Sequence, residues 1–301
     1  MKKVLLVVAA AVGFLLVAAT GFVLSRIHRY DESTHKRYDF PYPEVMRSND
    51  PAVLARGKHL AESIGVCTTC HGADMAGGHE DALGPLGRVV MPNVTTGRGA
   101  RGEVYTDLEM SRLLRHGVKR DGTTVRMMPV HEMAWWPEED VSAVISYLRS
   151  LPAVDGDPGL VEVSAFGKVL DTLDMAIPFD VARRVEHGPI PKAPPAGPTV
   201  AYGEKLAINC SGCHGSHFSG GPIPGAPPDM PVPPNLTADP SGLGRYDLAA
   251  FQRAMREGLS KSGAKLRPPM PVDVLRNMND TEITALWLFL RSLPPTPFGK
   301  R

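Results

Sequence analysis

The chain has 301 residues and a formal net charge of +1, with charged residues making up 22% of the sequence. This balance excludes the strongly basic surface that binds nucleic acid through its phosphates. The length allows two domains of about 100 residues each, and 29 prolines with 30 glycines indicate that these domains are rich in loops.

The amino-terminal segment is the first predicted element. After Lys2 and Lys3, residues 4–24 carry no charged side chain, and a membrane-spanning helix needs about 20 such residues. We therefore predict a transmembrane signal anchor at 4–24 and a juxtamembrane linker at 25–48. The alternative is a cleaved signal peptide, for which Ala18-Ala19-Thr20 is the candidate cleavage site. In both cases the leading lysines predict that the rest of the chain lies in the periplasm, outside a bacterial inner membrane.

Two pentapeptides contain all four cysteines of the chain. They read Cys-Thr-Thr-Cys-His at 67–71 and Cys-Ser-Gly-Cys-His at 210–214. The C-x-x-C-H pattern is typical of c-type haem attachment, in which two cysteines form thioether bonds with the haem and the histidine binds the iron. We predict two covalently bound haem c groups. Their predicted attachment residues and proximal ligands are Cys67, Cys70 and His71 in one motif and Cys210, Cys213 and His214 in the other.

Other uses of the cysteines fit the spacing less well. A zinc site made of two C-x-x-C pairs has about 15 to 20 residues between the pairs, whereas 140 positions separate Cys70 from Cys210. Redox dithiols or a disulfide framework leave the histidine after each second cysteine unexplained.

Beyond the pentapeptides, the two halves of the chain share sequence in one register. Three segments correspond at an offset of 142: Pro92-Asn93-Val94-Thr95 with Pro234-Asn235-Leu236-Thr237, Met128-Pro129-Val130 with Met270-Pro271-Val272, and Leu148-Arg149-Ser150-Leu151-Pro152 with Leu290-Arg291-Ser292-Leu293-Pro294. A duplicated domain is the simplest explanation. We predict a first repeat at 49–153, a connector at 154–196 and a second repeat at 197–295.

Each repeat is predicted to be mainly α-helical. A first helix, at 51–64 and 200–208, leads into the haem motif, and a middle helix covers 106–117 and 247–258. The closing helix, at 138–150 and 280–292, has apolar residues at helical spacing, acidic residues at its start and an arginine near its end, as the helix dipole favours.

The remaining segments are predicted to be loops, with one exception. The proline-rich stretch at 222–234 is expected to be irregular, and 189–198 to be a stiff link. In the connector, Phe166, Val169, Leu170 and Leu173 predict a short amphipathic helix that packs against a haem domain. Its alternative role is to dock a partner.

The second axial ligand of each iron is predicted to be a methionine. A thioether sulfur together with histidine raises the reduction potential of a haem iron. Met128 and Met270 correspond under the repeat, and they lie 57 and 56 residues after His71 and His214.

Other methionines and histidines are not expected to bind iron. Met91, Met127 and Met230 have no methionine at the corresponding position of the other repeat. A bis-histidine site would need histidines that correspond in the two repeats. His116, His131 and His217 have no such counterpart, and we expect them to be loop or surface residues.

These motifs resemble class I cytochromes c, which have an amino-terminal helix, a C-x-x-C-H motif, a Met-Pro loop and a closing helix with an aromatic residue. The resemblance implies that a glycine of the first helix crosses that aromatic closely, which pairs Gly57 with Tyr147 and Gly203 with Phe289. More narrowly, the chain is similar to the cytochrome c subunits of membrane-bound periplasmic alcohol and gluconate dehydrogenases. Those subunits commonly carry three haems, whereas this chain has two haem motifs.

The function expected from these features is electron transfer by a membrane-anchored protein rather than catalysis. The expected partners are a dehydrogenase or quinol-oxidising complex on one side and a terminal oxidase or soluble cytochrome on the other. One alternative is a dihaem enzyme such as a peroxidase, for which His131 and Glu132 are the candidate acid/base groups. Another is a haem-bearing subunit of a terminal oxidase.

Overall fold

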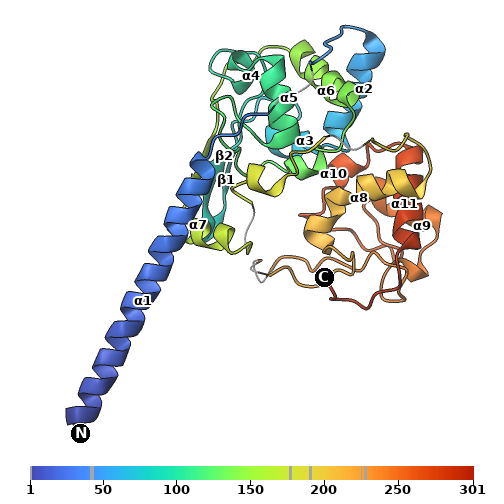
Figure 1. Ribbon diagram of the computed structural model, residues 1–301. Helices are drawn as coiled ribbons and strands as arrows, with labels where there is room; N and C mark the ends of the chain where they lie inside the picture. The colour runs from blue at the N-terminus through green and yellow to red at the C-terminus, as the bar shows by residue number, and fades with distance from the viewer. Residues whose placement is uncertain (1, 41–43, 176–177, 190–191, 225, 227–228) are drawn as a thin grey trace.

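The computed structural model describes the whole chain except residues 1, 41–43, 176–177, 190–191, 225 and 227–228. A long amino-terminal helix projects from a mainly helical body, in which the two repeats lie side by side (Figure 1). Parts of the predicted loops at 189–198 and 222–234 lie outside the described residues.

The elements follow the order of the two predicted repeats. The first repeat contains α2 (Pro51–Glu62), α3 (Cys67–His71), β1 (Glu80–Ala82), η1 (Gly84–Leu86), β2 (Gly87–Val90), α4 (Arg101–Val104), α5 (Asp107–His116), η2 (Val130–Glu132) and α6 (Glu138–Ser150). The connector contains β3 (Leu160–Val163), α7 (Ala165–Thr172) and η3 (Ala182–Arg184). The second repeat contains α8 (Val200–His214), η4 (Leu243–Arg245), α9 (Leu248–Glu257), α10 (Val272–Leu275) and α11 (Asp280–Ser292). The predicted mainly α fold is confirmed, and the closing helices α6 and α11 begin and end at the predicted residues.

The amino-terminal helix α1 (Lys2–His35) is long and apolar enough to cross a membrane. Residues 4–24 are exposed along their whole length. The helix then continues to His35 through residues that we expected to form a linker, because its last turns pack on the body. Tyr30 and Thr34 are buried, and the Lys168 ammonium of α7 donates to Asp31 at 2.7 Å.

The connector helix α7 packs against α1 and against η1 of the first repeat, as its amphipathic pattern predicted. The connector also supplies a strand that we did not predict. β1, β2 and β3 form an antiparallel sheet in that order, with Gly87 opposite Val163 and Val90 opposite Leu160. The residues around β3 therefore belong structurally to the first repeat.

In each repeat the first helix crosses the closing helix at a glycine. A Cβ added at Gly57 would overlap a carbonyl oxygen of α6 and lie 2.9 Å from the Cβ of Tyr147. A Cβ added at Gly203 would meet α11 and Phe289 in the same way. Only glycine allows this approach, so the expected pairing of each glycine with the aromatic of the closing helix is confirmed.

The two repeats share one hydrophobic core. A single cluster of buried side chains includes Leu60 and Ile145 of the first repeat together with Leu206 and Leu286 of the second. Polar contacts also cross the boundary between the repeats. They are the hydrogen bond between His59 Nε2 and Glu282 Oε1 at 2.7 Å, the bond from Asn277 to the Glu62 carbonyl at 2.9 Å, and the bond from Asn209 to the Ile64 carbonyl. The repeats therefore pack as one body.

Candidate haem sites

The first haem motif forms the single helical turn α3, and the second forms the end of the longer helix α8. Ten positions separate Gly57 from Cys67, but only seven separate Gly203 from Cys210. The first repeat accommodates its three extra residues by breaking the helix before Cys67, where Val66 adopts a left-handed conformation with φ of 46°. Both motifs thus reach equivalent positions by different backbone routes.

The proximal histidines are oriented identically in the two repeats. Nδ1 of His71 lies 2.8 Å from the Pro92 carbonyl oxygen, and Nδ1 of His214 lies 2.8 Å from the Pro234 carbonyl oxygen. Because a carbonyl oxygen only accepts, each Nδ1 carries the proton and each Nε2 keeps a free lone pair. This is the tautomer that binds a metal through Nε2.

The asparagine after each of these prolines fixes the loop that holds the carbonyl. Asn93 donates to the Val154 carbonyl at 2.7 Å and accepts from the Thr95 amide at 2.9 Å. Asn235 makes the equivalent bonds in the second repeat, at 2.7 and 2.8 Å. The repeated Pro-Asn-x-Thr segment therefore ties the histidine-bonding loop to the chain that follows the closing helix.

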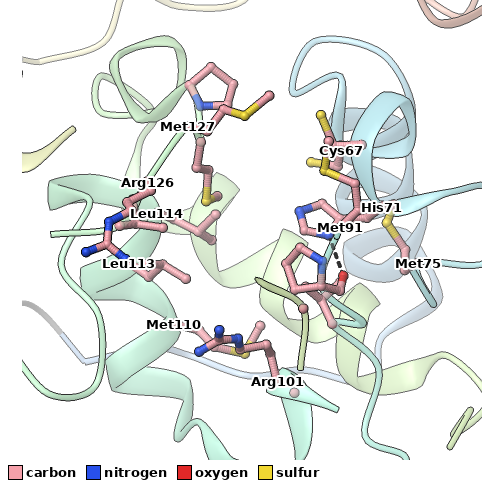
Figure 2. Close-up of a pocket in the computed structure, with 18 of the residues that line it drawn as sticks. Cys67, His71, Met75, Met91, Arg101, Met110, Leu113, Leu114, Arg126 and Met127 are labelled. Carbon is pink, nitrogen blue, oxygen red and sulfur yellow. Dashed lines mark hydrogen bonds between the residues drawn. The ribbon is translucent and has the colours of Figure 1, made fainter. Parts of the chain in front are cut away.

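A cavity of about 280 Å³ lies beside α3 in the first repeat. Cys67, Cys70, His71 and Met128 all line it. Figure 2 shows Cys67 and His71 on one side of this cavity, with Leu113, Leu114 and Met127 facing them from the other. The structure thus brings the predicted attachment residues and both predicted iron ligands of the first repeat to one space.

The other methionines are placed differently in the two repeats. Met91 and Met127 also line the cavity beside α3, so lining alone does not select Met128. Met230 lines a separate hollow of about 160 Å³ among prolines, together with none of the cysteines. Met270 is partly buried against the shared core. The Met270 carbonyl accepts a hydrogen bond from the Val272 amide at 2.9 Å, and the Met128 carbonyl accepts the equivalent bond from the Val130 amide at 2.8 Å.

The cavity lining of the first repeat suits a haem, which is an apolar macrocycle with two propionate carboxylates. Its walls are largely aliphatic, and the cations Arg101, Lys119 and Arg126 also line it. The Arg126 Nε is buried with no hydrogen-bond partner among the described residues. A buried donor of this kind requires an acceptor, which a carboxylate would supply. The residues present therefore fit haem c.

Burial keeps the attachment residues and proximal histidines neutral in the protein without haem. It raises the pKa of the Cys67 thiol and of the Cys210 thiol to about 12. Burial also lowers the pKa of His71 and of His214 below the usual value, against the opposing effect of the proline carbonyls. Both imidazoles are therefore in the unprotonated form that a metal requires.

Of the three histidines that we did not expect to bind iron, one lies in a different environment from the one expected. His131 and His217 are exposed, as predicted. His116 is buried at the end of α5, because its ring packs on Phe40 and its Nδ1 lies 3.2 Å from Nδ1 of His187. Burial, followed by the nearby His187, Arg115 and Arg112, lowers the pKa of His116 to about 4. Its expected place at the surface was therefore wrong.

Glu132 of η2 is close to both haem motifs. Its carboxylate helps to raise the pKa of all four cysteine thiols, two in each repeat. The Glu132 side chain is only 13% exposed, and its Oε2 has no hydrogen-bond partner among the described residues. Burial raises the pKa of this carboxyl to about 7.

The fold and these sites define a haem-binding protein with C-x-x-C-H attachment motifs. Residues 54–152 and 200–294 match the family model described as cytochrome c. These segments make up more than half of the chain, so the chain belongs to the cytochrome c family, whose members bind haem c covalently.

The chain is also similar to subunits of several dehydrogenases. It is 29% identical over 280 residues to the cytochrome c subunit of the quinone-dependent alcohol dehydrogenase of Gluconacetobacter polyoxogenes, over 82% of this chain and 57% of the relative. It is 28% identical over 281 residues to the gluconate 2-dehydrogenase cytochrome c subunit of Pantoea cypripedii, over 82% of this chain and 60% of the relative. The fructose dehydrogenase cytochrome subunit of Gluconobacter japonicus is 31% identical over 101 residues, which are 31% of this chain and 21% of the relative. This chain thus spans under two thirds of the length of these relatives.

Proposed function

We propose that this protein is a membrane-anchored dihaem cytochrome c that carries electrons in the periplasm from a dehydrogenase or a quinol-oxidising complex to a terminal acceptor. The observation that carries the proposal is the repeated histidine geometry. His71 and His214 each present a free Nε2 because a proline carbonyl binds Nδ1. Each is followed, 57 or 56 residues later, by a Met-Pro pair.

In this proposal Cys67 and Cys70 hold one haem c, and Cys210 and Cys213 hold the other. His71 with Met128 and His214 with Met270 supply the axial ligands. Histidine and thioether ligands together leave no iron position open for a substrate, so the protein moves electrons and is not itself an enzyme. Because the dehydrogenase cytochrome subunits align with most of this chain, we propose a dehydrogenase as the electron donor.

The ligand assignment is tested by substituting each proposed methionine in the haem-loaded protein. We expect Met128→Ala and Met270→Ala each to retain two covalent haems, but to convert one haem from low spin to high spin and lower its potential. Met230→Ala is the matched control, because Met230 lines the separate hollow. Pyridine haemochrome analysis gives the haem count, and electronic and EPR spectra give the spin states. An unchanged low-spin spectrum in either variant would exclude that methionine as the ligand.

The enzyme alternative has one observation in its favour. Glu132 and His131 form an acid/base pair near the first haem motif, with Nε2 of His131 4.0 Å from a carboxylate oxygen of Glu132. A peroxidase would need one iron to open beside such a pair. Hydrogen peroxide turnover by the purified dihaem protein, lost in Glu132→Gln, would support this alternative over simple electron transfer.

The membrane anchor and the partner need separate experiments. α1 carries 21 uncharged residues, enough to cross a bilayer core of about 30 Å. We expect the full-length protein to remain in the membrane fraction after a high-salt wash and to keep its amino-terminal residues. A mature protein that begins after residue 20 would instead indicate a cleaved signal peptide. Co-purification from detergent-solubilised membranes separates a dehydrogenase partner from a terminal oxidase.

A further inference from the structure

We propose that Glu132 is a proton-binding group shared by the two haem sites, which takes up a proton when the protein is reduced and releases it on oxidation. The inference rests on the proposed dihaem function. In this role, the Glu132 carboxyl couples electron transfer at the haems to the binding of a proton.

The first argument is the position of Glu132 between the two motifs. Asn209, which precedes Cys210, donates to the Ile64 carbonyl just before the first motif, so the motifs approach each other at the boundary of the repeats. η2, which carries Glu132, packs against α8 of the second repeat. The carboxylate acts electrostatically on the cysteines of both motifs. A change in charge at Glu132 is therefore felt at both haem sites.

The second argument is the absence of a compensating cation among the described residues around this carboxyl. On η2 itself, His131 is the neighbouring titratable group, and partial desolvation of its ring lowers its pKa although the side chain is 46% exposed. On α3 and α8 the groups whose pKa Glu132 affects are the four cysteines, which no longer titrate once they are thioethers. On α5, Arg115 donates to the Trp136 carbonyl at 2.8 Å, and the carboxylates that act on it are Glu138 and Glu139. Arg112, also on α5, donates to the carbonyls of Lys119 and Arg120.

Burial is accordingly the cause that raises the pKa of Glu132 to about 7. An electron added at either haem site places more negative charge nearby, and this disfavours the ionised carboxylate further. The proton affinity of Glu132 should therefore increase on reduction. By linkage, protonation of Glu132 must favour reduction by the same free energy.

The third argument comes from the second repeat. Position 274 corresponds to position 132 at the offset of 142, and it holds a valine. Val274 lies in α10 and is buried, and the Glu132 side chain in η2 is 13% exposed. An apolar side chain thus satisfies the packing at this position. A buried carboxyl without a full set of partners costs stability, so its presence in the first repeat calls for another role.

The coupled step is balanced in electrons and protons. One electron arrives from the redox partner, and one proton from the solvent forms an O–H bond on the Glu132 carboxylate. Oxidation by the acceptor protein reverses both changes. His131 provides the route to solvent, because it is exposed and its Nε2 lies 4.0 Å from the Glu132 Oε1.

The test uses the full-length, haem-loaded protein in detergent, with the midpoint potentials of both haems measured by spectroelectrochemistry from about pH 5 to about pH 9. We expect the wild-type potentials to fall with rising pH around neutrality. A tenfold difference in proton affinity between the oxidised and reduced protein corresponds to about 59 mV of this fall. Glu132→Gln and Glu132→Val should flatten the pH dependence, since both variants lack a titrating group and the valine copies the second repeat. Glu139→Gln removes an exposed carboxylate of the first turn of α6 and should leave the wild-type slope.

Two results would overturn the proposal: wild-type potentials that do not vary with pH near neutrality, or a Glu132→Gln variant with the wild-type slope. Proton uptake on reduction of the wild-type protein in weakly buffered solution at about pH 7 is a second measurement that needs no variant. Its absence would also overturn the proposal. Failure of the proposed function would be seen differently, as a haem count other than two or as a high-spin haem in the wild-type spectrum.

Discussion

The side chains of Asn93 and Asn235 each form a long-range hydrogen bond that their sequence motif does not predict. The repeat identified both asparagines as equivalent, but their partners could not be read from the sequence. Each bonds a carbonyl about 60 positions away, on the segment after the closing helix. No local pattern encodes such a contact, because it depends on the path of the whole repeat. The cysteines and proximal histidines were predictable because their chemistry requires a fixed local spacing.

Glu132 also gives a prediction at the scale of a residue. A carboxyl whose pKa rises from 4.5 to about 7 on folding binds its proton more tightly in the folded state. The folded state therefore loses stability as the pH rises through this interval, by about 3 kcal/mol for the full shift. Glu132→Gln has no such titration. We therefore expect the difference in unfolding free energy between Glu132→Gln and wild type to shift in favour of the variant as the pH rises from about 4.5 to about 7.

Urea unfolding of both haem-loaded proteins at about pH 5 and about pH 8 measures this difference. The advantage of Glu132→Gln should be larger at the higher pH. Parallel stability profiles for the two proteins would show that the folded and unfolded states bind this proton equally.

The helices were more predictable than the strands. α6 and α11 have helical apolar periodicity, acidic first turns and a terminal arginine, and their limits follow from these signals. Asn279 and Glu282 add a capping box at the start of α11. β1, β2 and β3 have only three or four residues each, which is too short for an alternating pattern to emerge. The pairing of β2 with β3 also joins segments far apart in the chain.

The glycine at the crossing of α8 and α11 leads to a prediction at the scale of an element. Gly203→Ala should destabilise the protein by at least about 2 kcal/mol, because the new Cβ must push the two helices apart. Gly212 is the matched control on the same helix, since a Cβ there would meet no atom within 4 Å. Gly212→Ala should be neutral or stabilise α8 by up to about 1 kcal/mol through helix propensity.

Thermal unfolding of the two haem-loaded variants measures the effect. If Gly203→Ala lost no more stability than Gly212→Ala, α8 and α11 would be able to move apart at their crossing without a cost in free energy. The comparison depends on normal haem content, which absorbance spectra establish first.

At the scale of the whole molecule, the repeats pack more intimately than the sequence indicated. The duplication predicted two copies of one domain, but not that their hydrophobic side chains form a single cluster. Contacts between repeats break the internal symmetry, since a surface of one copy faces a different surface of the other. The repeat itself therefore carries no signal of them. The cavity that joins Cys67, His71 and Met128 was predictable in its residues, though not in the additional methionines that line it.

The contact between His59 and Glu282 tests this shared packing. Glu282 is 1% exposed, and His59 binds its Oε1 at 2.7 Å. His59→Ala leaves this oxygen buried without that partner and should cost about 1 to 3 kcal/mol. His217→Ala, which alters an exposed histidine, is the control and should change stability by less than about 0.5 kcal/mol.

Calorimetry of the haem-loaded protein measures both effects. We expect one cooperative transition in the wild type, shifted to lower temperature in His59→Ala. Two resolved transitions in the wild type would show that the repeats unfold independently and would contradict the inferred role of the shared core.

The continuation of α1 beyond the apolar run determines how the protein would meet its partners. Residues 25–35 extend the helix by about 16 Å, and the Asp31 and Lys168 pair fixes this stalk to the body. If α1 is embedded as proposed, the body stands at a set height above the lipid, with its rotation limited to the axis of the stalk. The protein then meets membrane-bound partners by diffusing laterally in the membrane. A partner can exchange electrons with it only if the partner's redox centre lies at a similar distance from the bilayer surface. Inserting a flexible segment between residues 24 and 30, ahead of the contacts that Tyr30, Asp31 and Thr34 make with the body, would remove this restriction on height.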